Sequence, residues 1–200
     1  RIWAEPHPFF QSVKQGAHLF QGITDSTMER GEGWHFIHLG QFIERAGNVA
    51  ALLSAYLAVE ETGLSALHAS DLYVEWLGLL RSCTAFEAFC KVYSADLQFE
   101  QIAEFLLLND SFPFSVNFAA SAMRSAIEGI TDTTDTRKHN AILRRIGRLK
   151  ATLDYEQIGD LLAADLGRTL DAIQSQCAQV HNDVFESYIA YPVDARLAAA

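Results

Sequence analysis

Apolar residues recur at intervals of three and four along most of this chain, and this spacing constrains the fold more than any other feature. Residues at this spacing share one face of an α-helix, whereas a half-buried strand alternates apolar and polar residues. Strand-like alternation is essentially missing from the sequence, and only four prolines interrupt it. In the clearest stretch, the apolar positions are Phe36, Leu39, Ile43, Ala46, Ala50, Leu53 and Leu57. The sequence therefore predicts an all-α protein.

Similar patterns predict further helices before and after this stretch. Besides the helix that runs from about residue 34 to 57, we expect one that begins at Pro8 and ends before residue 28, and others over about 70–93, 99–108, 113–130 and 142–153. The last helix has apolar positions from 158 to 188 and would extend beyond them to about 35 residues and a length near 50 Å. Seams with three-four spacing favour nearly antiparallel packing. We therefore expect a multi-helix, mostly antiparallel bundle with a long C-terminal helix.

Length and composition narrow the class of protein. Half of the 200 residues are hydrophobic, which is enough for one core, so residues 1–200 are expected to form one domain, with the polar run 131–136 as a weak linker. A net charge of −10 argues against a general nucleic-acid binder. No apolar run reaches the roughly 20 residues that span a bilayer. Three cysteines without metal-ligand spacing suit a reducing cytoplasm.

The adjacent pair Glu44-Arg45 lies inside the clearest helical stretch. Neighbouring helical residues point about 100° apart, so these two cannot easily pair with each other. Charges beside a buried seam are costly unless they are partnered. The polar residues that we expect around the pair are His38, Gln41, Asn48 and, from the next predicted helix, Arg81.

Three interpretations of this pair remain open. The favoured one is a buried ion-pair network that fixes helix register, with Arg81 as the partner of Glu44, because charges between apolar seams more often specify packing than perform chemistry. The second is an anion or carboxylate site built from Arg45, Arg81 and their polar neighbours. The third is ordinary solvent exposure.

Few other residues are arranged in a pattern typical of metal binding, nucleophilic catalysis or phosphate binding. We therefore expect no metal, no cofactor and no catalytic residue. Glu32-x-x-His35 resembles half of a di-iron motif, but such bundles need the motif twice. Cys83 and Cys90 are seven residues apart on one helix face, as small core residues are. No glycine-rich phosphate loop is present.

A basic cluster stands out in this acidic chain. Its members are Arg137, Lys138, Arg144, Arg145, Arg148 and Lys150, all within 14 positions. One interpretation is a solvated helix face that balances the acidic remainder. The other is a docking patch for an acidic partner or a phosphate-bearing ligand, with electrostatic attraction raising the association rate.

Several segments together resemble the alpha-E family, a group of bacterial α-helical domains named for a Glu-Arg motif. The resemblance is carried by residues 20–28, 31–46, 75–83 and 103–115, and Glu44-Arg45 matches the motif. Family members usually carry a further helical segment upstream with its own Glu-Arg motif. The resemblance therefore implies the C-terminal portion of the family domain, without the N-terminal helices. We expect such a fragment to expose apolar surface and to self-associate.

The resemblance also implies a function. Alpha-E proteins are typically encoded beside, or fused to, circularly permuted ATP-grasp ligases and transglutaminase-like cysteine peptidases. This implies a cytoplasmic, non-catalytic helical partner or fused domain of a peptide-modifying system.

The alternative is an enzyme of amide or peptide metabolism with a cleft lined by Glu44, Arg45 and Arg81. Glutamate would be the acid/base, and arginine would hold a carboxylate. An enclosed pocket that reaches Glu44 and Arg45 would favour chemistry, whereas full enclosure of the pair by side chains would favour architecture.

Overall fold

The computed structural model describes residues 6–61, 69–94, 96–133 and 139–190, and these ranges are helical apart from short connections, with no strand among them. In chain order, the helices are α1 (Pro6–Thr27), α2 (Glu32–Glu61), α3 (Ala69–Ser82), α4 (Phe86–Val92), α5 (Phe99–Leu108), α6 (Val116–Thr133), α7 (His139–Tyr155), α8 (Ile158–Ala164) and α9 (Leu166–Val184). A π-helical turn, η1 (Phe185–Ile189), extends α9. The predicted all-α fold is confirmed.

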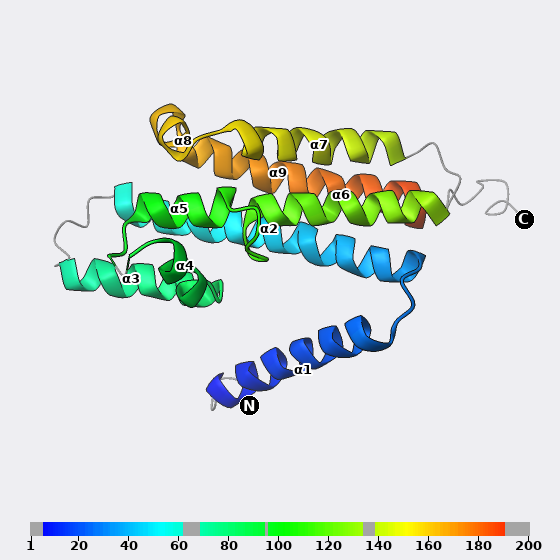
Figure 1. The fold of residues 1–200 in the computed structure, drawn as a ribbon, viewed down its shortest axis with the longest axis horizontal. Helices are drawn as coiled ribbons and strands as arrows, with labels where there is room; N and C mark the ends of the chain where they lie inside the picture. Colours follow the sequence, from blue (N-terminus) through cyan, green and yellow to red (C-terminus); the bar gives the residue numbers. More distant parts are fainter. Residues whose placement is uncertain (1–5, 62–68, 95, 134–138, 191–200) are drawn as a thin grey trace, which may run out of the picture.

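The bundle is organised around α2. This helix packs mainly against α6 and α9, and α7 packs in turn against α6 and α9 (Figure 1). The face of α2 that meets them is the predicted seam, since Leu39, Ala46, Ala50 and Leu53 are at most 1% exposed. The mostly antiparallel bundle is therefore held by the three-four pattern that the sequence shows most clearly.

One close approach fixes how α2 lies on α6. A Cβ atom at Gly129 of α6 would lie only 2.2 Å from Cε1 of His35 on α2. Real Cβ atoms do not approach other atoms so closely, so the imidazole takes the space that any larger residue at position 129 would fill. His35 is therefore a packing residue of the α2–α6 seam.

Two predicted helices are each broken in two, and in this respect the sequence analysis was wrong. The expected helix over 70–93 is interrupted at Thr84, where φ is 52°, and the expected helix over 158–188 is interrupted at Asp165, where φ is 133°. Both are non-glycine residues in a backbone region that favours glycine, which explains why composition gave no signal. The Asp165 side chain accepts a 3.0 Å hydrogen bond from the Arg168 amide and so caps α9.

The C-terminal helix is long but is not the longest. It has 19 residues in α9 before η1 continues it, whereas α2 has 30 residues.

Helix α1 stands apart from the rest of the bundle. Figure 1 shows it diverging from α2, and its only buried residue is Thr24. Its large apolar side chains face solvent, with Phe10, Leu19 and Phe20 at least 60% exposed. This helix therefore presents an apolar surface that the described part of the chain does not cover.

The polar run predicted as a linker, 131–136, does not lie wholly between helices. Its first three residues complete α6, which ends at Thr133. Residues 134–136 lie outside the described residues.

Candidate functional site

Glu44 and Arg45 point in different directions from α2, as adjacent helical residues must. Glu44 is exposed and Arg45 is half-buried. Neither forms an ion pair within the described ranges. The expected ion pair between Glu44 and Arg81 is therefore not formed, and the buried register-setting network is not what this structure contains.

The Arg45 guanidinium is held in place by uncharged groups. Its Nη1 donates a 2.9 Å hydrogen bond to the backbone carbonyl of Pro113. Its Cζ lies 4.2 Å from the centre of the Phe114 ring and 5.0 Å from that of Phe42. Burial lowers the pKa of Arg45 below its ordinary value, but a guanidinium remains charged at neutral pH. Arg45 is thus an oriented cation without an anion among the described residues.

The turn between α5 and α6 supplies both Pro113 and Phe114, and its own hydrogen bonds hold it in shape. The Asn109 side-chain oxygen accepts hydrogen bonds from the amides of Ser111 (3.0 Å) and Phe112 (2.8 Å). The Ser115 hydroxyl accepts a 3.0 Å bond from the Phe118 amide and so caps α6. Because the turn is braced at both ends, the Pro113 carbonyl and the Phe114 ring are preorganised against Arg45.

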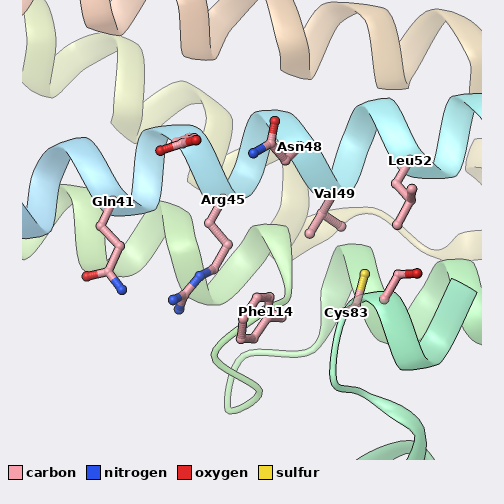
Figure 2. Close-up of a pocket in the computed structure, with 9 residues that line it drawn as sticks. Gln41, Arg45, Asn48, Val49, Leu52, Cys83 and Phe114 are labelled. Carbon is pink, nitrogen blue, oxygen red and sulfur yellow. The ribbon is translucent and has the colours of Figure 1, made fainter. Parts of the chain in front are cut away.

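Arg45 lies in the wall of an open pocket of about 430 Å³ on the outer face of α2. Figure 2 shows Gln41, Arg45, Val49 and Leu52 extending from α2 toward Phe114 and Cys83, whereas Asn48 points elsewhere. The full lining consists of Gln41, Glu44, Arg45, Asn48, Val49, Leu52, Ser82, Cys83 and Phe114. The pocket therefore combines one cation and several amide groups with an apolar wall.

A second pocket of about 320 Å³ continues from the first. It lies between α1 and α2, and Gln41 and Glu44 line both pockets. Phe20 and Ile37 contribute apolar surface to it. Because the two pockets share Gln41 and Glu44 of α2, we refer to them together as the outer groove.

The thiol in the first pocket is buried and poorly suited to nucleophilic attack. Burial raises the pKa of Cys83 to about 11, so the thiolate that nucleophilic catalysis requires is scarce at neutral pH. Cys83 therefore contributes a small neutral wall to the pocket.

The other residues predicted around the motif are spread over different places. Gln41 and Asn48 line the first pocket, as Glu44 and Arg45 do. Arg81 is not in that lining; it is exposed, with its Cζ 5.9 Å from the Phe86 ring. His38 lies at the elbow between α1 and α2, where its Nε2 is 3.2 Å from the Asp25 carboxylate.

The predicted basic docking patch is divided by its interactions. Arg145 pairs with Asp183 at 2.8 Å and also bonds to Gln179, which ties α7 to α9. Lys150 pairs with Asp154 one turn along α7. Arg144 and Arg148 are exposed, and Arg137 and Lys138 lie outside the described residues. The described part of the cluster therefore consists of one ion pair between α7 and α9, one ion pair within α7 and two exposed arginines.

Neither a metal centre nor a membrane span is evident in the described ranges. No three histidine, cysteine, aspartate or glutamate side chains converge there in a way that suits a metal ion. No helix described is long and apolar enough to cross a bilayer.

The sequence analysis missed the aromatic and backbone partners of the site. Phe42 and Phe114 flank Arg45, yet in sequence they are ordinary core-type residues. At the elbow, Arg30 lies over the Trp34 ring at 4.4 Å and bonds to the Asp25 carbonyl at 2.7 Å. The one available signal was a second Glu-Arg dipeptide, Glu29-Arg30, beside this elbow.

Comparison with known proteins gives a family but no individual relative. No curated protein and no solved structure matches the chain. A family model named Alpha-E, described as a predicted alpha-helical domain with a conserved ER motif, matches residues 1–189. This chain, whose Glu44-Arg45 pair opens onto a surface pocket, belongs to the Alpha-E family.

Proposed function

We propose that this chain is a non-catalytic recognition domain, the helical partner or fused domain of an ATP-grasp ligase/transglutaminase-like peptide-modifying system. The observation that carries the recognition role is Arg45, a half-buried cation with no anion of its own among the described residues, facing an open pocket. An uncompensated charge of this kind lowers stability, so its retention is better explained by binding than by packing. The identity of the partner system rests on what the family resemblance implies.

The pocket's chemistry favours binding over catalysis. Burial raises the pKa of the Cys83 thiol to about 11, and the Glu44 carboxylate is exposed to solvent. The alternative of an enzyme needs Arg81 in the cleft, and Arg81 does not line the pocket. The pocket is also open rather than enclosed, so recognition has the better support.

Helix α1 extends the proposed contact surface. Its exposed Phe20 lines the second pocket beside Glu44, so a partner seated in the outer groove also covers apolar surface of α1. We assign this surface to the same partner protein, and self-association of the chain through α1 is the competing outcome. The cysteines of the described ranges are free thiols, which supports the cytoplasm as the compartment of this assembly.

The test is affinity purification of the full-length protein from its native host, followed by mass spectrometry. We expect an ATP-grasp ligase among the captured proteins, and we expect Arg45→Met to reduce its recovery at least about tenfold, the effect of losing one charged hydrogen-bonded contact. Lys91→Met is the control, because Lys91 is an exposed cation outside both the groove and the basic cluster and has no ion pair among the described residues. Equal recovery with Arg45→Met, or capture of the chain's own copies alone, would overturn the proposal.

A further inference from the structure

The guanidinium of Arg45 has more hydrogen-bonding capacity than the described residues use. An arginine offers five N–H donors, and one bond, to the Pro113 carbonyl, is formed here. The rings of Phe42 and Phe114 lie against the group, but they carry no net charge and do not accept strong hydrogen bonds. The remaining donors form a planar fork of the kind that pairs with a carboxylate.

The surroundings of the fork select among anions. Gln41 extends to the same side of α2 as Arg45 (Figure 2), so an amide lies near the cation. Glu44 and Asn48, one helical turn apart, share another face of α2 and border the same pocket. A single cation bordered by a carboxylate favours an anion of one charge, because the repulsion from Glu44 is about twice as large for a doubly charged phosphate monoester as for a carboxylate.

The rest of the pocket suits a peptide. Val49, Leu52 and Phe114 form an apolar wall beside the cation. The Cys83 thiol belongs to the same wall and is uncharged at neutral pH, because burial raises its pKa to about 11. The amide of Gln41, which extends to the same side as Arg45, can both donate to and accept from a peptide backbone. A volume of about 430 Å³ falls in the range of small-ligand sites.

We propose that this pocket binds a peptide through a carboxylate, which the Arg45 fork holds while an apolar side chain of the peptide lies against Val49, Leu52 and Phe114. This inference rests on the proposed recognition role and names its ligand class. The carboxylate belongs to a peptide chain end or to an acidic side chain. In either case, the rest of the peptide follows the outer groove past Gln41 toward α1.

The test is a titration of the full chain followed by ¹H–¹⁵N NMR, which reports the Arg45 Nε–Hε group directly. The probes are acetyl-alanyl-phenylalanine with a free C-terminal carboxylate, the same peptide as its C-terminal amide, and acetyl-glutamyl-phenylalanine amide. We expect the Arg45 signal to shift saturably with at least one of the two acidic probes, and the neutral amide to bind about 10- to 100-fold more weakly. If the bound carboxylate is a peptide C-terminus, the first probe should bind more tightly than the third. If it is an acidic side chain, the third probe should bind more tightly.

Substitutions test whether the Arg45 side chain itself, and not the fold as a whole, holds the carboxylate. Arg45→Met should lose the preference for the acidic probe, and Arg45→Lys should keep part of it because a lysine retains the charge but not the fork. Lys91→Met should bind as the unchanged protein does, because Lys91 lies outside both pockets. Equal affinity for acidic and neutral probes, equal binding by Arg45→Met, or stronger binding of inorganic phosphate would overturn the inference.

The two proposals fail separately. If Arg45→Met loses the captured ligase while the acidic probe binds no better than its amide, recognition stands and the carboxylate assignment is wrong. If the acidic probe binds through Arg45 and no ligase is captured, the ligand class stands and the partner is wrong.

Discussion

Arg45 on α2 and Arg145 on α7 are both half-buried arginines on amphipathic helices, yet their surroundings differ in kind. Arg145 lies at the seam between α7 and α9, where Asp183 supplies a carboxylate at 2.8 Å. Arg45 lies on the outer face of α2, where two aromatic rings and one carbonyl hold it and no carboxylate among the described residues pairs with it. The difference teaches that Arg145 is satisfied within the bundle, whereas Arg45 is oriented without a paired anion among the described residues, which is the observation behind the proposed binding role.

Helix α2 likewise has a face that belongs to the core and a face that lines the outer groove. Substitutions on these two faces give the largest expected difference in stability. Leu53 is fully buried, whereas its neighbour Leu52 is only partly buried and lines the first pocket. Leu53→Ala should lower the free energy of unfolding by about 2–5 kcal/mol, because it leaves a cavity in the core. Leu52→Ala should cost less than about 1 kcal/mol, because solvent fills the space. Urea unfolding of both variants checks this, and equal losses would mean that the outer groove is part of the core.

The α2–α6 seam gives the next largest effect. Gly129→Ala places a methyl group where the His35 ring lies, so the ring or the α2–α6 contact must shift to make room. We expect a loss of about 1–3 kcal/mol, which is typical of overpacking. In a protein that already carries His35→Ala, the Gly129→Ala substitution should cost less stability than it does in the unchanged protein, because the ring that the methyl group meets is gone. Full stability of the single variant in thermal unfolding would show that the ring has room to rotate away.

The alkylation rates of two thiols test whether water reaches the wall of the groove more easily than it reaches the bundle interior. Burial raises the pKa of Cys83 in the groove and of Cys177 on α9 to about 11 each. A thiol whose pKa is raised on folding stabilises the protein below the unfolded value near 9, and that contribution is lost as the pH rises toward 11. At pH 8, both thiols should alkylate about 100-fold more slowly in the folded chain than after denaturation, on thiolate fraction alone. Rapid alkylation of Cys83 with protection of Cys177 would show that water reaches the groove wall.

The smallest expected effect is at Glu44. Its carboxylate is exposed and has no ion pair among the described residues, so Glu44→Gln should change the free energy of unfolding by no more than about 0.5 kcal/mol. Chemical denaturation at neutral pH measures this change. A loss of several kcal/mol would restore the buried ion-pair interpretation that the sequence favoured.

The sequence was sufficient for the fold because burial follows periodicity. Leu39, Ala46 and Leu53 were predicted to face the core of the bundle, and they do. It was insufficient at Thr84 and Asp165, where local hydrogen bonds at a helix end accompany a backbone conformation that their residue types rarely adopt. Helix breaks of this kind leave the apolar pattern intact on both sides.

The candidate site shows the complementary limit. The Glu-Arg pair is visible in the sequence, but the ring of Phe114 and the carbonyl of Pro113 reach Arg45 from a turn about 70 residues away, and their distance in sequence hides them. Sequence distance hides the Arg145–Asp183 pair in the same way. Arg145 was predicted to belong either to a solvated helix face or to a docking patch, and the one ion pair predicted for the motif, Glu44 with Arg81, is not formed.

The most direct test of this account is a comparison of the free energies of unfolding of Arg45→Met and Arg145→Met, measured in parallel by urea denaturation at neutral pH. Arg145→Met leaves the Asp183 carboxylate without its partner at a partly exposed seam, so we expect a loss of about 1–2 kcal/mol. Arg45→Met removes an uncompensated charge while keeping a side chain against Phe42 and Phe114, so we expect a change of less than about 0.5 kcal/mol. A loss for Arg45→Met that equals or exceeds the loss for Arg145→Met would contradict the account and make Arg45 a structural residue.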